Sequence, residues 1–435
     1  MKFHSTRNPA HTATLSEAIA QGIAPDGGLY VPESLPRLDV AALSGLSLRD
    51  TARAVLAPFF AGDELESELG RIVEEAFDFP APVGAIDGDL EVLELFHGPT
   101  AAFKDFGARC LAAALERLER RRSHQPLTIL VATSGDTGGA VAAAFHRRRN
   151  VHVVVLYPRG LVSPRQEQQL TCWGDNVHAA SVGGTFDDCQ RMVKEALADP
   201  ALRERYRFSS ANSINIGRLL PQVVYYAASS VDVHRRTGRD ASFIVPSGNL
   251  GNAMACAWAR CLGLPIGRVV LAHNANRTVP DYFTSGEWRP RPSVATLASA
   301  MDVGNPSNME RLRQLLGQVR ALRGKLSAAS VGDDAIRERI REDFRVRGRT
   351  WCPHTAVAAE VHARLQREQR DARHWVLVAT AHPAKFSEIV EPLIGAPVPV
   401  PPALAALLDL PRHCTEIDAN LSSLSRILAT ACSTP

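Results

Sequence analysis

Lys104 has unusual surroundings for a lysine, in the segment LFHGPTAAFKDFG. Its neighbours Ala101, Ala102, Phe103 and Phe106 are apolar, so we expect the amine to be partly removed from water. Removal from water disfavours the charged form of an amine, which lowers its pKa and favours nucleophilic or Schiff-base chemistry. A lysine that reaches the surface from the start of a helix is the alternative, and this segment alone does not decide between them.

Two turns have the composition of anion-binding loops. Their residues are Ser134, Gly135, Asp136 and Thr137 in ATSGDTGGA, and Gly248, Asn249, Leu250, Gly251 and Asn252 in PSGNLGNA. Small residues between a strand and a helix leave several backbone N–H groups free at the helix start, which suits an anion. An ordinary helix cap or tight turn is the alternative for each. Neither turn has the GxGxxG or GxxxxGK[ST] spacing, so nothing supports a dinucleotide or nucleoside triphosphate there.

A third polar segment, SSANSINIGR, contains Asn212, Ser213 and Arg218. The Arg218 guanidinium could bind a second anionic group through two parallel hydrogen bonds. A surface ion pair is the alternative. Together with Lys104, these segments offer two candidate anion sites and one unusual lysine, but the sequence does not show that they meet in space.

The elements that position these turns are short apolar runs, each followed by an Ala-rich helical pattern. Strands are predicted over Glu91 to Phe96, from Leu127, over Val151 to Tyr157, from Ser242, and ending near Thr380. This alternation predicts an open, mostly parallel sheet covered on both faces, with ligands at the carboxyl ends of its strands.

The remaining segments are less informative. Residues 1–88 predict an N-terminal subdomain. Residues 309–349 carry many charges at helical spacing and predict surface helices whose charge serves solvation. The Pro-rich segment 396–404 is expected to cross the surface.

Composition narrows the class of protein. The chain has 435 residues, 45% hydrophobic and 22% charged, with a formal net charge of +3, so a nucleic acid or a membrane surface is not expected as main partner. The eight cysteines are scattered, and His97, His354 and His382 lack ligand spacing. We therefore expect reduced cysteines, structural histidines, no metal site and a cytoplasmic protein.

With these residues in view, the chain resembles the threonine synthase family of pyridoxal-phosphate enzymes. The matching segments run in family order from about residue 20 to residue 390: APDGGLYVP, LFHGPTAAFKDFG, VATSGDTGGA, LYPRGLVSPRQEQQL, SANSINIGRLLPQ, VPSGNLGN, AMDVGNPSN, CPHTAVA and TAHPAKF. The resemblance implies the tryptophan synthase β-like fold (fold type II), an α/β architecture with two open, mostly parallel sheets flanked by helices. It implies an N-terminal subdomain (1–88), a large pyridoxal-phosphate domain (89–125 and 235–435) and a smaller mobile domain (126–234).

The resemblance also implies a role for each candidate residue. Lys104 would form a Schiff base with the cofactor and later move protons. Gly248 to Asn252 would hold the cofactor phosphate, and Thr380 would hydrogen-bond its pyridine nitrogen. The substrate α-carboxylate would bind the turn Ser134 to Thr137, where we expect Asp136 to use its backbone N–H or to point its side chain elsewhere. Asn212, Ser213 and Arg218 would bind the substrate phosphate.

The implied reaction converts O-phospho-L-homoserine and water to L-threonine and phosphate. A related phospho-homoserine lyase or dehydratase that gives 2-oxobutyrate is the nearest alternative. A non-catalytic cofactor-binding protein and a nicotinamide-dependent oxidoreductase are further alternatives with little sequence support. A monomer is favoured, and a dimer is possible.

Overall fold

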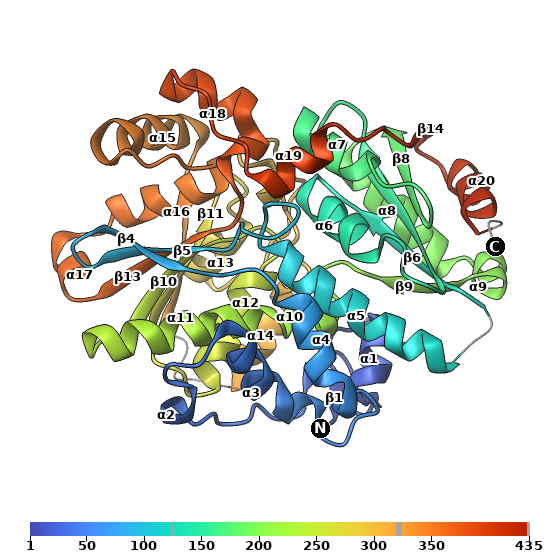
Figure 1. Cartoon of the computed structure of the whole chain (residues 1–435), viewed down its shortest axis with the longest axis horizontal. Coiled ribbons are helices and arrows are strands. Elements are labelled where there is room, and N and C mark those ends of the chain that lie inside the picture. The colour runs from blue at the N-terminus through green and yellow to red at the C-terminus, as the bar shows by residue number, and fades with distance from the viewer. Residues whose placement is uncertain (123–124, 319–323, 433–435) are drawn as a thin grey trace.

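Three β-sheets organise the chain in the computed structural model, which describes residues 1–122, 125–318 and 324–432 (Figure 1). The largest has the strand order β12-β11-β10-β13-β5-β4 and the second the order β14-β8-β7-β6-β9. A small N-terminal sheet has the order β2-β1-β3. The two open, mostly parallel sheets confirm the expected fold class.

The six-stranded sheet is parallel except for the edge strand β4, which pairs antiparallel with β5. Its strands are β4 Val83–Asp87, β5 Leu90–Glu94, β10 Ala241–Pro246, β11 Ile266–His273, β12 Leu326–Ser330 and β13 His374–Ala379. Strands β10 and β13 are buried along their whole length, as expected of parallel strands covered on both faces.

The five-stranded sheet is parallel throughout. Its strands are β6 Leu127–Ala132, β7 Val151–Pro158, β8 Val177–Gly183, β9 Arg207–Ser210 and β14 Cys414–Asp418. The turn Ser134 to Thr137 follows the carboxyl end of β6, where the parallel arrangement predicts a ligand.

Helices cover both faces of each large sheet. The helices after the N-terminal segment are α5 Lys104–Arg122, α6 Asp136–Phe145, α7 Pro164–Thr171, α8 Phe186–Ala198, α9 Pro200–Arg205, α10 Ile216–Leu219, α11 Gln222–Thr237, α12 Gly251–Cys261, α13 Thr278–Ser285, α14 Met309–Gln318, α15 Asp333–Arg347, α16 Pro353–Ala363, α17 Arg367–Asp371, α18 Ser387–Ile394, α19 Pro402–Leu408 and α20 Leu421–Ala431. Short 3-10 turns are η2 Ser299–Met301 and η4 Pro383–Phe386.

The N-terminal segment forms the small sheet and four helices beneath α5 and α11 (Figure 1). Its elements are β1 Phe3–Ser5, β2 Thr12–Ala13, α1 Leu15–Gln21, β3 Tyr30–Pro32, α2 Val40–Leu43, α3 Leu48–Phe60, η1 Glu66–Glu68 and α4 Leu69–Ala76. Apolar side chains of α1, α3 and α4 join the same core as α5, so this segment supports the helix that Lys104 begins.

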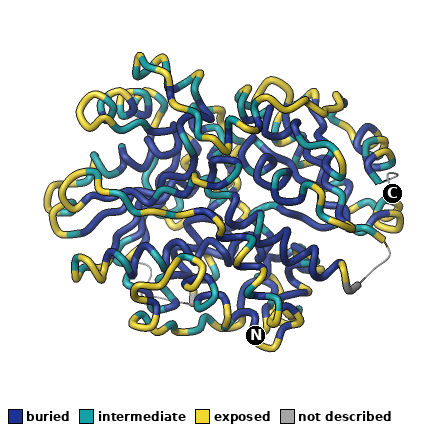
Figure 2. The backbone as a smooth tube through the Cα atoms, viewed as in Figure 1, coloured by how far each residue is buried: buried dark blue, intermediate teal, exposed yellow. Residues whose placement is uncertain are grey.

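Alternate strand residues face different cores. In β10, Phe243 and Val245 join a central core that also contains α5, α11 and α12, whereas Ile244 joins an outer core with α16. In β6, Ile129 and Leu130 divide in the same way between the central core and an outer core with α8. Buried residues fill the interior of the molecule, and exposed residues lie mainly at its rim (Figure 2).

Two strands lie where none was expected from the sequence. Strand β14 pairs in parallel with β8, because the segment after α19 crosses to the edge of the smaller sheet. Within 309–349, β12 adds an edge strand between α14 and α15. The domain boundaries themselves stay a prediction.

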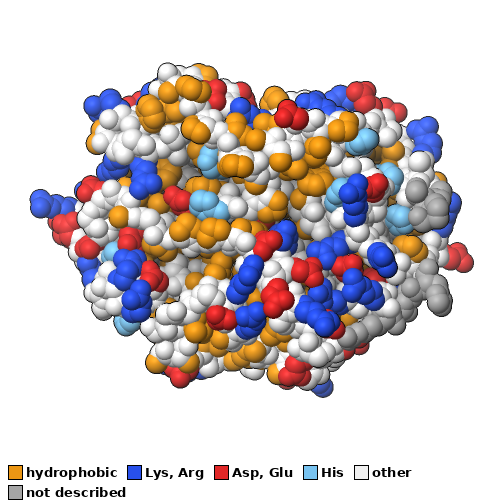
Figure 3. Space-filling model, viewed as in Figure 1, with side chains coloured by type: hydrophobic (Ala, Val, Ile, Leu, Met, Phe, Trp, Pro, Cys, Tyr) orange, Lys and Arg blue, Asp and Glu red, His pale blue; other side chains and the backbone are white. Residues whose placement is uncertain are grey.

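Charges on the visible surface are mixed. Lys and Arg side chains lie among Asp and Glu side chains over the face in Figure 3, in agreement with the near-balance of the composition. Within the described ranges, no helix is long and apolar enough to cross a membrane.

Candidate active site

Lys104 is the first residue of α5, and the turn before it is held from two sides. The Asp105 carboxylate accepts hydrogen bonds from the N–H and hydroxyl of Thr100, at 2.9 and 2.5 Å. The backbone N–H of Phe103 donates to the carbonyl of Thr380 at 2.8 Å. The end of β13 is thereby fixed beside the lysine, which brings Thr380 and Lys104 together as the resemblance implies.

The Lys104 side chain is 15% exposed. Burial lowers the pKa of Lys104 to about 8; the Asp136 carboxylate opposes this change, and the cations of Lys385 and Arg218 add to it. This agrees with the expected removal from water, because about a tenth of such an amine is neutral at pH 7.

Asp136 faces two lysines. Its Oδ1 lies 2.8 Å from Nζ of Lys385 and accepts a hydrogen bond of 3.0 Å from Gln166, and its Oδ2 lies 3.9 Å from Nζ of Lys104. Burial opposes the charge of Asp136, but the Lys385 and Lys104 cations hold its pKa well below the usual range. The side chain therefore points toward the candidate catalytic lysine as one member of a charge cluster.

The turn after β6 keeps several backbone donors free. Among the described residues, nothing accepts the N–H groups of Ser134, Asp136 and Thr137. The N–H of Gly135 is already used, because it donates to the Thr133 hydroxyl at 3.0 Å. Gly135 has a φ of 131°, which favours glycine, and a Cβ there would come within 2.5 Å of Gln166.

The turn after β10 forms a cradle of N–H groups. No acceptor in the described part of the chain binds the N–H groups from Gly248 to Asn252, the last two of which begin α12. A Cβ on Gly248 would lie 2.8 Å from the Cα of Met301, so the loop and the segment 299–308 pack too closely for a side chain. A phosphate group fits such a cradle of free amides at a helix start.

Ser213 lies against this second turn. Its hydroxyl accepts hydrogen bonds from Asn249 at 2.7 Å and from Asn308 at 3.3 Å. The polar segment that contains Asn212 and Arg218 is thereby attached to the cradle. A contact of Ser213 with a substrate stays a prediction.

Arg218 is 2% exposed and is packed against the first turn of α5. Its Nη1 donates to the carbonyl of Ala211 at 2.5 Å, while its Nε has no partner in the residues described. A Cβ on Gly107 would lie 3.1 Å from this Nε, so the guanidinium lies one helical turn beyond Lys104. Burial lowers the pKa of Arg218 to about 10, which leaves the group charged at neutral pH.

The charge state around Arg218 suits an anion. The buried Oδ1 of Asn212 also lacks a partner in the described ranges, but it is an acceptor, so only the amide N–H groups of Asn212 could bind an anion. Arg218 forms no ion pair there, and Asp105, the carboxylate that raises its pKa, is engaged by Thr100. A buried cation in this state could bind an anion from outside the chain, and that role of Arg218 stays a prediction.

The three histidines in the motif turns make structural hydrogen bonds. His97 binds Glu94 at 2.9 Å, His354 accepts from the N–H of Ala300 at 3.1 Å and His382 accepts from that of Ala384 at 3.2 Å. In the described part of the chain, no group of His, Cys, Asp and Glu could hold a metal ion.

Two residues at or near the site escaped the sequence reasoning. Lys385 belongs to the matching segment TAHPAKF, which is the signal that could have indicated it. Arg311 is 1% exposed and donates to the carbonyls of Tyr30 and Ile214 at 3.0 and 2.7 Å, so the expectation that charge in 309–349 serves only solvation is wrong there. This arginine joins the N-terminal sheet to the segment that holds Asn212 and Ser213.

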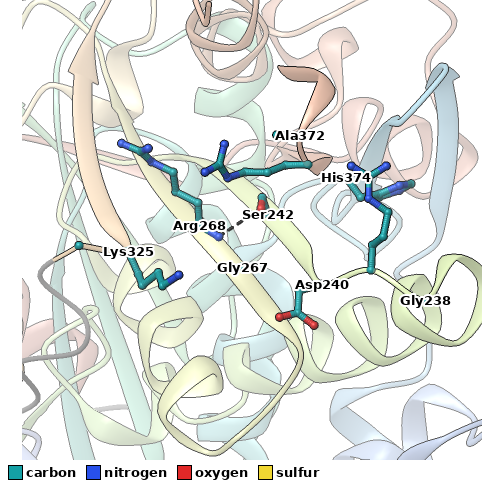
Figure 4. A pocket seen from close by; sticks show the side chains of 11 residues that line it. Gly238, Asp240, Ser242, Gly267, Arg268, Lys325, Ala372 and His374 are labelled. Atoms are coloured by element: carbon teal, nitrogen blue, oxygen red, sulfur yellow. Dashed lines mark hydrogen bonds between the residues drawn. The ribbon is translucent and has the colours of Figure 1, made fainter. Parts of the chain in front are cut away.

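A hollow of about 390 Å³ lies at the amino ends of the strands of the six-stranded sheet, opposite the ends that carry the candidate residues. Its lining residues precede or begin β10, β11, β12 and β13, and include Asp240, Arg268, Lys325 and His374 (Figure 4). The candidate residues follow the carboxyl ends of β10 and β13, so this hollow is separate from the site.

Three parts of the chain match models of known families. Residues 90–381 match the pyridoxal-phosphate dependent enzymes, residues 2–77 the threonine synthase N terminus and residues 355–428 the threonine synthase C-terminal region. The threonine synthase of Serratia marcescens is 39% identical over 98% of this chain and 99% of its own length. That of Escherichia coli is 38% identical with the same coverage. This chain belongs to the threonine synthase family.

Solved structures of threonine synthases share the whole fold. The Escherichia coli enzyme superposes with a TM-score of 0.90 at 38% identity, covering 99% of this chain and 100% of its own. The pyridoxal-phosphate-bound threonine synthase of Brucella melitensis has a TM-score of 0.90 at 34% identity, with 99% of each chain covered. Membership in the family makes pyridoxal phosphate the cofactor, and the cradle after β10 and the amine of Lys104 fit its phosphate and its aldehyde.

Proposed function

We propose that this member of the family converts O-phospho-L-homoserine and water to L-threonine and inorganic phosphate. The observation that carries the proposal is the Arg218 guanidinium, buried without an ion-pair partner in the described residues, one helical turn from Lys104. An amine of lowered pKa can accept a proton, so its position beside a buried anion site suits a substrate that loses a proton and carries a phosphate.

Each end of the substrate has donors of its own. The free N–H groups of Ser134, Asp136 and Thr137 would bind the α-carboxylate. Arg218 and Asn212 would hold the phosphate ester. Arg218 would also stabilise the phosphate as the bond between its oxygen and the γ-carbon breaks, because charge then grows on that oxygen.

Lys104 would move the protons. Pyridoxal phosphate, when bound, supplies an electron sink that lets protons leave carbon atoms near the substrate amino group. The neutral amine of Lys104 would accept the α-proton and return a proton later, for which a pKa of about 8 is well matched to neutral pH. Thr380 would orient the cofactor from its pyridine nitrogen with an uncharged hydroxyl.

A substrate panel tests the proposal. Cofactor-loaded protein would be given O-phospho-L-homoserine, L-homoserine, L-serine and L-threonine in parallel, with phosphate and amino acids measured. We expect turnover of O-phospho-L-homoserine alone, with L-threonine as product. Formation of 2-oxobutyrate from L-threonine or L-homoserine at a comparable rate would identify a dehydratase and overturn the proposal.

A further inference from the structure

Lys385 is a buried cation whose position suggests more than packing. Its side chain is fully buried in η4, after β13, and its Nζ donates to the carbonyl of Thr100 at 2.8 Å. The same Nζ lies 2.8 Å from the Oδ1 of Asp136, whose other oxygen faces Lys104 at 3.9 Å. Two lysines therefore share one buried carboxylate.

This arrangement joins the two large sheets. Asp136 begins α6 after β6, whereas Lys104 and Lys385 are held beside β13. The helix α7 supports the contact, because Ser163 donates to the carbonyl of Lys385 at 3.0 Å and Gln166 donates to Asp136 at 3.0 Å. The carboxylate is thus held from both sheets.

We propose that Lys385 is a positioning residue that neutralises Asp136, so that a larger share of Lys104 is in the neutral amine form and the Ser134–Thr137 turn can accept an anion. A carboxylate alone beside Lys104 would stabilise the ammonium form of that lysine and repel a substrate carboxylate. Paired with Lys385, Asp136 brings no net charge to the turn. This inference rests on the proposed function for the substrate carboxylate, but its effect on Lys104 does not.

Other charged or titratable groups also act on this cluster. The Asp105 carboxylate lies within electrostatic range of Lys385 and accepts two hydrogen bonds from Thr100. Arg218 adds a second cation that favours the neutral form of Lys104. His354 lies within electrostatic range, but burial lowers its pKa to about 4, so it is neutral at pH 7. Burial raises the pKa of the Cys352 thiol, which therefore stays protonated. Lys385 is then the cation that contacts Asp136 directly.

The test measures how the reaction of Lys104 with added pyridoxal phosphate depends on pH, in the full-length chain prepared without cofactor. The rate of pyridoxal phosphate incorporation, followed by its visible absorbance, would be recorded from pH 6 to pH 10 for wild type, Lys385→Met, Asp136→Asn and the double variant. The matched control is Lys325→Met, because Lys325 is exposed and lies near the amino ends of the strands of the larger sheet, away from Lys104. The cofactor's own titration is common to all five proteins, so differences in midpoint report Lys104.

The expected shifts have opposite signs. Lys385→Met should raise the midpoint by about one pH unit and Asp136→Asn should lower it, while the double variant should lie between them. Lys325→Met should match wild type. Midpoints for Lys385→Met and Asp136→Asn that stay within 0.2 units of wild type, or that move in the same direction, would overturn the proposal.

Two further comparisons keep the test decisive. If Lys385→Met does not fold, the double variant is compared with Asp136→Asn, and it must still have the higher midpoint; equal midpoints would overturn the proposal. The KM for O-phospho-L-homoserine should rise in Lys385→Met and recover in the double variant. Shifted midpoints without threonine formation by the wild type would overturn the proposed function and leave the charge arrangement standing.

Discussion

At the scale of single residues, the chemistry of this site depends on charges that are buried together. Lys104, Asp136, Lys385 and Arg218 are all largely or fully removed from solvent within one region. Charges interact more strongly where water is excluded, so each group alters the protonation of the others. The only cation of the four without an ion-pair partner in the described part of the chain is Arg218.

Replacing Arg218 should weaken the binding of substrates that carry phosphate. Arg218→Gln removes the charge and should raise the KM for O-phospho-L-homoserine by about 10- to 100-fold, because a hydrogen-bonded ion contact contributes about 1.5–3 kcal/mol. Arg218→Lys keeps the charge but loses the second parallel hydrogen bond, so its KM should be intermediate. Steady-state kinetics on cofactor-loaded protein measure both values.

The visible absorbance of the bound cofactor and the urea midpoint serve as controls for folding. If the KM of Arg218→Gln equals that of the wild type, Arg218 does not bind the substrate phosphate.

The sequence indicated most of these residues but not their partners. Lys104 and the two polar turns could be predicted because apolar neighbours and small residues at strand ends are local signals. The pairing of Asp136 with Lys385 joins residues 249 positions apart, and the burial of Arg311 depends on the N-terminal sheet. No local pattern reports such contacts.

At the scale of elements, the approach of α10 to α5 positions Arg218 beside Lys104. Gly107 makes this possible, because a Cβ there would lie 2.6 Å from the carbonyl oxygen of Arg218. The turn after β10 depends in the same way on Gly248 and the segment 299–308. Small residues at these points allow backbone to approach backbone closely.

Two glycine-to-alanine substitutions test the close contact between α5 and α10. Gly107→Ala should lower the free energy of unfolding by about 1–3 kcal/mol, because α10 must move away, and should raise the KM for O-phospho-L-homoserine. Gly70→Ala in α4 is the matched change, because a Cβ there would meet nothing within 4 Å. It should raise the free energy of unfolding by up to about 1 kcal/mol. Equal urea midpoints in the two variants would contradict the close contact.

Several strands could be predicted from continuous apolar runs, whereas the central strands β8 and β11 were not predicted. β6, β7, β10 and β13 all lie close to the expected ranges. The edge strands β12 and β14 were also missed. Each has five residues, of which only one is buried, so neither contains a continuous apolar run. Sheet membership of β14 depends on where the chain crosses after α19, which is a property of the tertiary structure.

At the scale of the whole molecule, a large interior keeps several histidines uncharged. Burial lowers the pKa of His273 to about 3 and the pKa values of His354, His362 and His382 to about 4, from an ordinary value of 6.5. The unfolded chain therefore binds protons below pH 6.5 that the folded chain does not bind. Stability should fall as the pH decreases from 6.5 toward 4.

The contribution of His273 can be isolated. His273→Gln removes a buried group that titrates only in the unfolded chain, so it should reduce the pH dependence of the unfolding free energy by up to about 1.4 kcal/mol per pH unit below pH 6.5. Urea unfolding at several pH values measures this slope. His413→Gln, the same change at an exposed position, is measured alongside His273→Gln. A slope in His273→Gln equal to that of the wild type would show that His273 does not titrate differently in the two states.

The two large sheets place the candidate substrate contacts on both sides of Lys104. The Ser134–Thr137 turn belongs to the smaller sheet, and the cradle Gly248–Asn252 belongs to the larger one. The alternation of strands and helices predicted an open parallel sheet, and the division into two sheets came from the family resemblance. The mutual packing of the two sheets depends on the central core that they share. A site between two sheets suits a reaction that must control when water reaches an intermediate.

Product stoichiometry tests the central claim most directly. Cofactor-loaded protein would be mixed with O-phospho-L-homoserine, and phosphate, L-threonine and 2-oxobutyrate would be measured over the same time course. The account predicts equal amounts of phosphate and L-threonine. Phosphate accompanied by 2-oxobutyrate in place of L-threonine would contradict it, because the protein would then eliminate phosphate without adding water.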